Sequence, residues 1–302
     1  MCKMRSDVFN KNSNAYDGKT RPEKIFEWDY ISCAPPLVSN LGVSADGVMA
    51  NGDKFSMLFP GSNGQLQPTM CCSIGAFTAV GTSPTVQGTV GASDADGTAA
   101  GLNLQMDSET ADNVGIEIVW GGSQFGSNSN KIIAQTHSAS FDVTINNADW
   151  SDYDCLSIGF RKVQEFQPGH GAILAASSGD PLYTDYVAFG CISPDDVQIS
   201  TDLNDSGDET VTDSGQATAA ANNHRFKVDL ASDGKVTYSH IGAAAMRQGA
   251  LAAPSTTAAY TFDSGDILVP YMFVLGTNQN SAVYLKSVDI TRSPAVKGHS
   301  IA

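Results

Sequence analysis

The sequence is poor in charged residues, and most of those present are acidic. Charged side chains make up 16% of the 302 residues, and 32 Asp and Glu against 17 Lys and Arg give a net charge of −15. A nucleic-acid surface needs clustered Lys and Arg to neutralise phosphates. The longest basic cluster is only Lys19, Arg21 and Lys24. The composition therefore argues against nucleic acid as a partner and indicates a self-repelling acidic surface.

Long apolar runs are missing too. No stretch approaches the roughly 20 apolar residues that a membrane-spanning helix needs, so we expect no membrane partner. The start of the sequence, Met1 to Asp7, has charged residues and no apolar segment after it, which predicts no signal peptide. We therefore expect synthesis in a cytoplasm, whatever the destination of the protein.

Cysteine and catalytic motifs are scarce. The six cysteines show no CxxC spacing, so we expect buried free thiols instead of a disulfide framework or a metal cage. A nucleophile elbow, an HExxH motif and a P-loop are all absent from the sequence. The five histidines are scattered, and His170 stands in a glycine-rich, loop-like stretch. These absences give no catalytic site to build on.

What the sequence does contain is a series of short apolar or alternating stretches divided by turn-forming pairs. Asp46-Gly47 and Asn51-Gly52 are such pairs, and Asp233-Gly234 predicts a two-residue hairpin turn. Helical periodicity is nearly absent. We therefore expect an all-β fold, a β-sandwich. The clearest predicted strands are 25–31, 55–59, 114–120, 140–145, 155–160, 186–192, 224–230, 235–240, 267–275 and 282–290.

The chain is expected to divide near residue 40. Residues 1–24 lack sustained periodicity and predict an extended N-terminal arm, and Pro35-Pro36 ends the strand that follows it. Residues 1–40 would thus form the arm and first strand, and residues 41–302 the β-sandwich domain. An arm of this kind suits docking against neighbouring subunits, so self-association is expected.

Several of the predicted strands resemble the concanavalin A-like jelly roll of legume lectins, laminin-G modules and many glucanases. The matching stretches include Ser140–Asn147, Leu156–Phe160 and His224–Leu230, and the likeness covers residues 114–291. It implies that the sandwich is of the concanavalin A-like type, an architecture that hosts many functions.

Within that fold, two phrases are similar to those of structural proteins of tailed phages. They are Leu156–Lys162 and Tyr183–Gly190. This resemblance implies a virion structural protein, a capsid decoration or cement protein, or part of a fibre. It further implies a homotrimer located in the virion, with the major capsid protein or other virion proteins as partners.

The likeness to legume lectins also implies a place for calcium and a transition metal. Asp142, Asn146 or Asn147, and Asp152 match the calcium-side positions, whereas Ser140 and Ser157 stand where the family has Glu and His. A hydroxyl is a poor substitute for a carboxylate or imidazole around a divalent ion. We therefore expect the transition-metal site to be absent.

A second acidic stretch gives the calcium candidate that we carry forward. Asp202, Asn204 and Ser206, followed by Gly207, copy the front half of a calcium loop, and Asp213 stands where a bidentate Glu is expected. The alternative is a solvated hairpin loop without a metal.

Carbohydrate binding is the alternative function, as an adhesin or fibre module. It needs an exposed aromatic platform, and Trp150, between Asp149 and Ser151, is the best candidate for glycan contact. The competing interpretation is a ring that caps a sandwich edge.

Glycoside hydrolysis is the enzymatic alternative that the resemblance brings in. Glucanases of this fold carry a Glu-x-Asp-x-x-Glu pattern on one strand, which supplies a nucleophile and an acid. No glutamate here belongs to such a pattern, and Glu117 has only Asp112 as its nearest acid. We therefore expect that the protein is not an enzyme.

Overall fold

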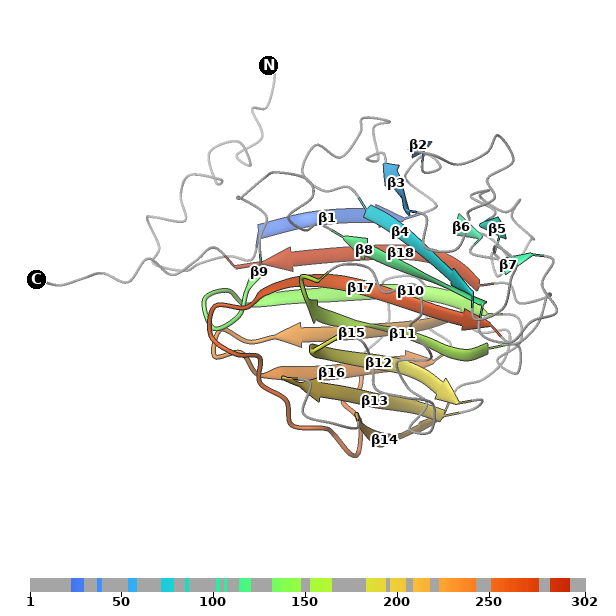
Figure 1. Cartoon of the computed structure of the whole chain (residues 1–302). Coiled ribbons are helices and arrows are strands. Elements are labelled where there is room, and N and C mark those ends of the chain that lie inside the picture. Colours follow the sequence, from blue (N-terminus) through green and yellow to red (C-terminus); the bar gives the residue numbers. More distant parts are fainter. Residues whose placement is uncertain are drawn as a thin grey trace, which may run out of the picture.

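In the computed structural model, the described part of the chain is built from antiparallel strands (Figure 1). No helix that could cross a membrane is found in this part. The all-β class predicted from the sequence is confirmed. The described residues are 23–29, 37–39, 54–58, 72–78, 85–86, 102–103, 106–107, 114–120, 132–147, 153–164, 183–193, 196–204, 209–217, 223–242, 251–276 and 283–293.

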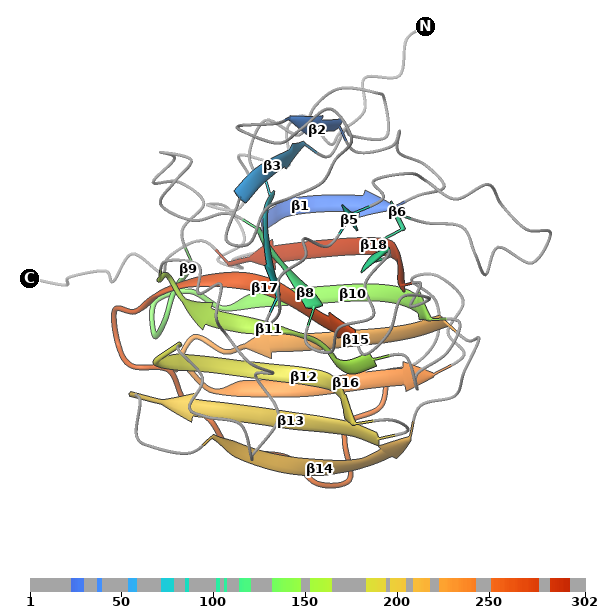
Figure 2. The ribbon, with the colours of Figure 1, turned by 45° about the vertical axis from the view of Figure 1, so that its right-hand side comes forward.

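Two large sheets make up the jelly-roll sandwich (Figures 1 and 2). The six-stranded sheet has the order β1 (Glu23–Asp29), β18 (Val283–Arg292), β10 (Ala139–Asn147), β15 (Asn223–Leu230) and β16 (Val236–Gly242), with β6 (Leu102–Asn103) pairing with β18. The ten-stranded sheet has the order β14 (Thr210–Ala217), β13 (Asp196–Leu203), β12 (Asp185–Ser193), β11 (Tyr153–Lys162), β17 (Ile267–Gly276), β8 (Val114–Trp120), β4 (Cys72–Thr78), β3 (Lys54–Leu58) and β2 (Leu37–Ser39), with β9 (Ile132–Ile133) pairing with β17. A separate pair joins β5 (Thr85–Val86) to β7 (Met106–Asp107).

The core lies between the two sheets. Because side chains alternate along a strand, β10 turns Phe141 and Val143 inward, and both are fully buried. Aromatic rings join the layers: Phe141 of the six-stranded sheet lies 5.3 Å from Trp120 and 6.2 Å from Phe160 of the ten-stranded sheet, centroid to centroid. These contacts hold the six-stranded sheet in place from its inner face.

The ten-stranded sheet is buried on its other face as well. Along β17, Met272 and Val274 join the core between the sheets, whereas Tyr271 and Phe273 point the other way and are also buried. This explains why 267–275 reads as a continuous apolar run, which is typical of strands covered on both faces.

The predicted strands lack the short β2, β5, β6, β7 and β9 and the longer β4, β13 and β14, of which β13 and β14 lie at one edge of the ten-stranded sheet. β13 alternates inward Val197 and Ile199 with polar Gln198 and Ser200, and β14 is mostly polar and exposed. An edge strand needs few apolar side chains because only part of one face is covered. The predicted first strand also forms two residues early, as β1, which pairs with β18. The rest of the predicted arm lies outside the described residues, so the boundary at residue 40 stays a prediction.

The predicted hairpin between β15 and β16 forms, but its loop has three residues instead of two. Leu230 pairs with Val236, and the Ala231 N–H donates to the Lys235 carbonyl at 2.8 Å, which leaves residues 232–234 as the loop. Within it, the Gly234 N–H donates to the Ala231 carbonyl at 2.9 Å. Gly234 has φ 85°, which glycine adopts without strain. A tight turn followed by a glycine in this conformation matches the right-handed twist of the two strands, and it adds one residue to the loop.

One of the six cysteines can be assigned. Cys191 on β12 is buried and forms no disulfide bond, as expected for it. The side chains of the other five lie outside the described residues.

Candidate functional site

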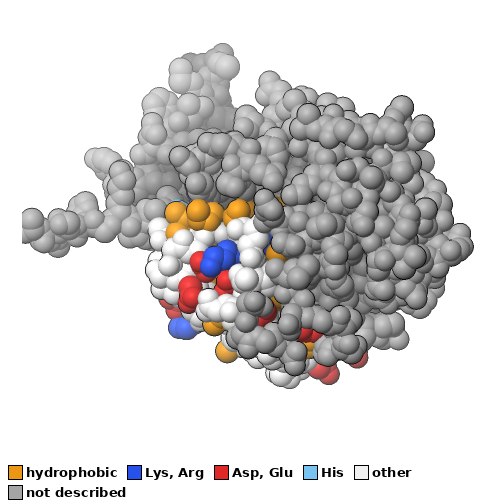
Figure 3. Space-filling model, in the orientation of Figure 1, with side chains coloured by type: hydrophobic (Ala, Val, Ile, Leu, Met, Phe, Trp, Pro, Cys, Tyr) orange, Lys and Arg blue, Asp and Glu red, His pale blue; other side chains and the backbone are white. Residues whose placement is uncertain are grey.

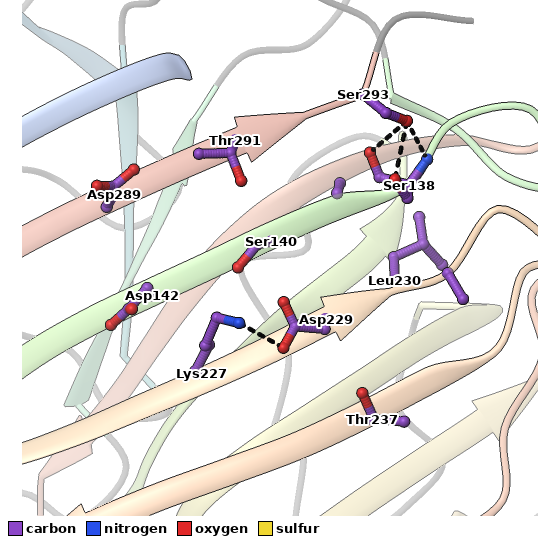
Figure 4. A pocket seen from close by; sticks show the side chains of 12 residues that line it. Ser138, Ser140, Asp142, Lys227, Asp229, Leu230, Thr237, Asp289, Thr291 and Ser293 are labelled. Carbon is purple, nitrogen blue, oxygen red and sulfur yellow. Dashed lines mark hydrogen bonds and ion pairs between the residues drawn. The ribbon is translucent and has the colours of Figure 1, made fainter. Parts of the chain in front are cut away.

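A polar hollow of about 480 Å³ lies on the outer face of the six-stranded sheet, the face turned away from the core (Figure 4). Strand alternation creates it, because the neighbours of inward Phe141 and Val143 must point outward. Its polar side chains come from four adjacent strands: Asp289 and Thr291 on β18, Ser140 and Asp142 on β10, Lys227 and Asp229 on β15, and Thr237 on β16.

The strand register arranges these side chains in two cross-strand rows. In the first row, Asp142 lies opposite Asp289 on one side and Lys227 on the other. In the second row, Ser140 lies opposite Thr291 and Asp229, and Asp229 faces Thr237. Neighbouring strands are about 4.8 Å apart, so each row presents a regular series of polar groups on a rigid surface.

Ion pairs fix part of the hollow. Arg225 of β15 donates to both oxygens of Asp142, from Nε to Oδ1 at 2.9 Å and from Nη2 to Oδ2 at 2.6 Å. This two-point bond raises the pKa of Arg225, with the charges of Asp142 and Asp289 acting in the same direction against the effect of burial. Lys227 Nζ donates to Asp229 Oδ2 at 2.6 Å (Figure 4). The pairs hold the carboxylates in fixed orientations, as a binding surface requires.

One end of the hollow is closed by a pair of serines. The Ser138 N–H and hydroxyl both donate to Ser293 Oγ, at 2.9 and 2.8 Å, and the Ser293 N–H donates to the Ser138 carbonyl at 2.8 Å (Figure 4). These bonds join the chain before β10 to the chain after β18. They keep the two strands in register where the hollow ends.

The remaining hydroxyls are available to a ligand. The side-chain hydroxyls of Ser140, Thr237 and Thr291 make no hydrogen bond to any residue that the structure describes. Each hydroxyl can donate one hydrogen bond and accept two. None of the residues lining the hollow is aromatic, so a ligand here would be held by hydrogen bonds and not by ring stacking.

The residues of the calcium candidate are spread over two strands and a turn. Asp202 lies in β13 and is 4% exposed. Asp213 lies in β14 opposite Gln198, four residues back along β13 from Asp202, which is about 13 Å at ~3.3 Å per residue. The structure does not bring these two carboxylates together.

Asn204 and Asp213 have structural partners. Asn204 has φ 60° at the end of β13, and its N–H donates to Asp185 Oδ1 at 3.0 Å. Asp213 Oδ1 accepts the Gly215 N–H at 2.7 Å. Ser206 lies outside the described residues. Within the described part of the chain, no group of three His, Cys, Asp or Glu side chains is placed to hold a metal ion.

The positions matched to lectin metal ligands are also separated. Asp142 lies in the hollow, whereas Ser157 lies on β11 of the other sheet. The side chain of Asn146 is buried and donates to Asn223 Oδ1 at 3.1 Å. Asp152, the Asn147 side chain and the glycan candidate Trp150 lie outside the described residues.

Acidic and basic groups also pair at the end of the sandwich. Lys162 Nζ lies 2.9 Å from Asp266 Oδ1 and 3.3 Å from Asp185 Oδ2. The hydrogen bond to Asp266 is the main cause that raises the pKa of Lys162. On the face drawn in Figure 3, the described basic side chains lie beside acidic ones. The ion pairs of Lys162 with Asp185 and Asp266 hold β11, β12 and the chain before β17 together.

Sequence reasoning missed most of the hollow. Of its residues, the sequence indicates only Ser140 and Asp142, at positions matched to lectin metal ligands, because the carboxylates of the hollow meet across strands and not along one strand. The available signal was the outward position of each polar residue between inward apolar ones. The pairing register, which brings together residues as distant in sequence as Asp142 and Asp289, leaves no comparable pattern in the sequence.

No protein-family model matches the chain, and no curated protein matches it. Among solved structures, it is similar to peanut lectin with a 9mer peptide (13% identity, TM-score 0.44, 80% of this chain and 98% of that chain covered). It is also similar to basic winged bean lectin with Tn-antigen (10% identity, TM-score 0.43, 91% of this chain and 99% of that chain covered). A third similar structure is the VIP36 exoplasmic/lumenal domain in its Ca2+/Man3GlcNAc-bound form (11% identity, TM-score 0.43, 67% of this chain and 84% of that chain covered).

These neighbours include legume lectins, which have the concanavalin A-like jelly roll. At these identities and TM-scores the likeness concerns the strand arrangement and carries no argument about ligands. The named structures give no support to the resemblance to tailed-phage structural proteins, which stays an expectation from the sequence.

Proposed function

We propose that the protein is a carbohydrate-binding module and that the polar hollow is its binding surface. The observation that carries this proposal is the pair of cross-strand rows, which place hydroxyls and carboxylates on one rigid face. Sugar hydroxyls both donate and accept hydrogen bonds, and such rows offer them both kinds of partner. The volume of about 480 Å³ lies within the usual range of small-molecule sites, roughly 300–1,000 Å³.

The charge of the hollow narrows the class of sugar. Three aspartates line it against Lys227 and the adjacent Arg225, which leaves one negative charge in excess, so an acidic sugar would meet net repulsion. We therefore propose neutral or amine-bearing sugars as ligands, in preference to sialylated or uronic-acid glycans.

The test is binding of the full chain to a glycan array, followed by calorimetry on the best neutral glycan. The double variant Ser140→Ala/Thr291→Val removes two ligand-facing hydroxyls without changing charge. We expect it to weaken binding about 10- to 100-fold, since each lost hydrogen bond contributes about 1 kcal/mol. The matched control is Thr210→Val on exposed β14, which should bind like the original chain. Absence of binding to every glycan, or full binding by the double variant, would overturn the proposal.

Calcium can be tested in the same assay. Arg225 occupies both oxygens of Asp142, the one lectin-type calcium position that lines the hollow. We therefore expect glycan binding to persist in EDTA with less than about a twofold change in affinity, because no ligand-facing hydrogen bond is removed. A loss of binding that added calcium restores would show instead that a metal site supports the surface, with Asp202 and Asn204 as residues to change next.

Virion decoration, capsid partners and the homotrimer stay expectations from the sequence, since the described residues do not bear on them. A carbohydrate-binding adhesin on a virion would combine the decoration role with the proposed binding function. Light scattering of the full chain and of a chain lacking residues 1–24 tests the self-association.

A further inference from the structure

Two histidines lie against each other inside the sandwich. His224 on β15 and His240 on β16 are 0% and 3% exposed. His224 Nδ1 and His240 Nε2 are 3.0 Å apart, and the rings stack nearly parallel, with an angle of 8° and a centroid distance of 5.3 Å. Only one of the two facing nitrogens can carry a hydrogen in such a contact, so the geometry holds only while at least one ring is neutral.

The surroundings of the pair are mainly aromatic. Phe226 stacks on His240 at 4.6 Å between centroids, and Phe189 of β12 meets it edge-on at 6.5 Å. The inward titratable neighbours are Tyr238, two residues before His240 on β16, and Cys191, two residues after Phe189 on β12. Tyrosine and cysteine are uncharged below pH 7, so neither would balance a new positive charge.

Burial, followed by the neighbouring His224, lowers the pKa of His240 from 6.5 to about 3. A histidine in the unfolded chain takes up a proton below about pH 6.5, whereas His240 in the folded sandwich stays neutral. The contribution of the neutral His240 ring to the free energy of unfolding is therefore fully present above pH 6.5. This contribution is lost progressively as the pH falls from 6.5 toward 3.

β16 is the element that can respond, because it is the last strand of the six-stranded sheet. Beyond β15, the described backbone contacts of β16 are few. The N–H groups of His240 and Ala252 donate to each other's carbonyls at 2.9 and 3.0 Å, and the Val236 N–H donates to the Tyr260 carbonyl at 3.1 Å. Edge strands open at lower cost than central ones. Proton uptake at the pair would therefore act on an edge strand.

We propose that the His224–His240 pair is an acid-sensitive latch that holds β16 on the sandwich near neutral pH and releases this edge in mild acid. Release would carry Thr237 away from the polar hollow, a consequence that rests on the proposed function. The latch itself does not depend on it, because its evidence lies wholly in the core.

The test is amide hydrogen exchange of the full chain without ligand between pH 7 and 5, corrected for the intrinsic pH dependence of exchange. The protection of Val236–Gly242 is expected to fall about tenfold per pH unit below 6.5 for each proton taken up. Strand β18, which is paired on both sides by β1 and β10, should keep its protection over this range. Unchanged protection of β16 down to pH 5 would overturn the proposal.

Two variants distinguish the effect of the histidine pair from other effects of acid on the protein. His224→Phe with His240→Phe replaces both hydrogen-bonding partners by apolar rings, which is far less costly than orphaning one, and it should abolish the pH response of β16. The control His137→Asn changes a buried histidine outside β16, whose Nδ1 accepts the Ile133 N–H. Burial, followed by the charge of Arg292, also lowers the pKa of His137. This control should leave the response of β16 in place.

A double variant that responds to acid like the original chain would refute the latch. If the double variant does not fold, NMR titration of the histidine rings in the original chain decides instead. Titration of His240 near pH 6.5 while β16 stays protected would refute it. Loss of glycan binding with the latch intact would count against the proposed function alone.

Discussion

Gly159→Ala is expected to prevent normal pairing of β11 with β12 and to lower the free energy of unfolding by about 3 kcal/mol or more, the upper range for overpacking. A Cβ on Gly159 would lie 1.7 Å from the Val187 carbonyl oxygen of the neighbouring strand. The obstacle is backbone and not a flexible side chain, so the two central strands must separate. The same oxygen accepts the Tyr271 hydroxyl at 3.1 Å, and the methyl group would disturb that bond as well.

Urea denaturation at pH 7.5, followed by tryptophan fluorescence, measures this effect. Gly265→Ala is the matched control, since its Cβ would meet nothing within 4 Å and its φ of 92° adds only backbone strain, about 1–2 kcal/mol. Tyr271→Phe, which removes only the hydroxyl, should cost about 1 kcal/mol. A Gly159→Ala protein as stable as Gly265→Ala would show that β11 and β12 are not packed as described.

Phe189→Ala is expected to cost about 3–5 kcal/mol, the usual range for emptying a large buried aromatic site. Phe189 is fully buried, with ring centroids of Phe226 at 5.6 Å and Tyr238 at 5.4 Å. It joins β12 of one sheet to β15 and β16 of the other. The rigid strands around it can close the resulting cavity only in part.

The same urea titration measures the loss, and Phe189→Leu serves as the graded comparison. Leucine keeps most of the buried volume, so it should cost clearly less than alanine. Equal and small losses for both, below about 1 kcal/mol, would mean that the sheets do not meet at this residue.

The strand pattern could be predicted because burial leaves a periodic trace in the sequence. Predicted 114–120 matches β8, and 224–230 differs from β15 by one residue. β4, which lies inside the sheet between β8 and β3, is absent from the predicted strands, and so are β13 and β14. β13 and β14 lie at an edge, where polar residues such as Gln198 and Asp213 are tolerated, so their pattern is weak. The acidic stretch that includes Asp202 was interpreted as a loop for the same reason.

The candidate site could not be predicted in this way. Its residues are ordinary polar positions on four strands, and only pairing across β18, β10, β15 and β16 brings them together. The residues singled out in the sequence were chosen as local clusters instead. Of these, Asp202 and Asp213 are held apart by the register of β13 and β14.

The sequence by itself determined the all-β class, most strands and the inward face of each, because apolar alternation records which side chains leave water. The register was decided by the tertiary structure. A two-residue loop at Asp233-Gly234 would place His240 opposite Lys227, on the outer face, because a one-residue shift turns every side chain over. The added loop residue places it opposite Phe226 instead. Packing against Phe189 of the other sheet favours this register, since it buries Val236, Tyr238 and the histidine pair together.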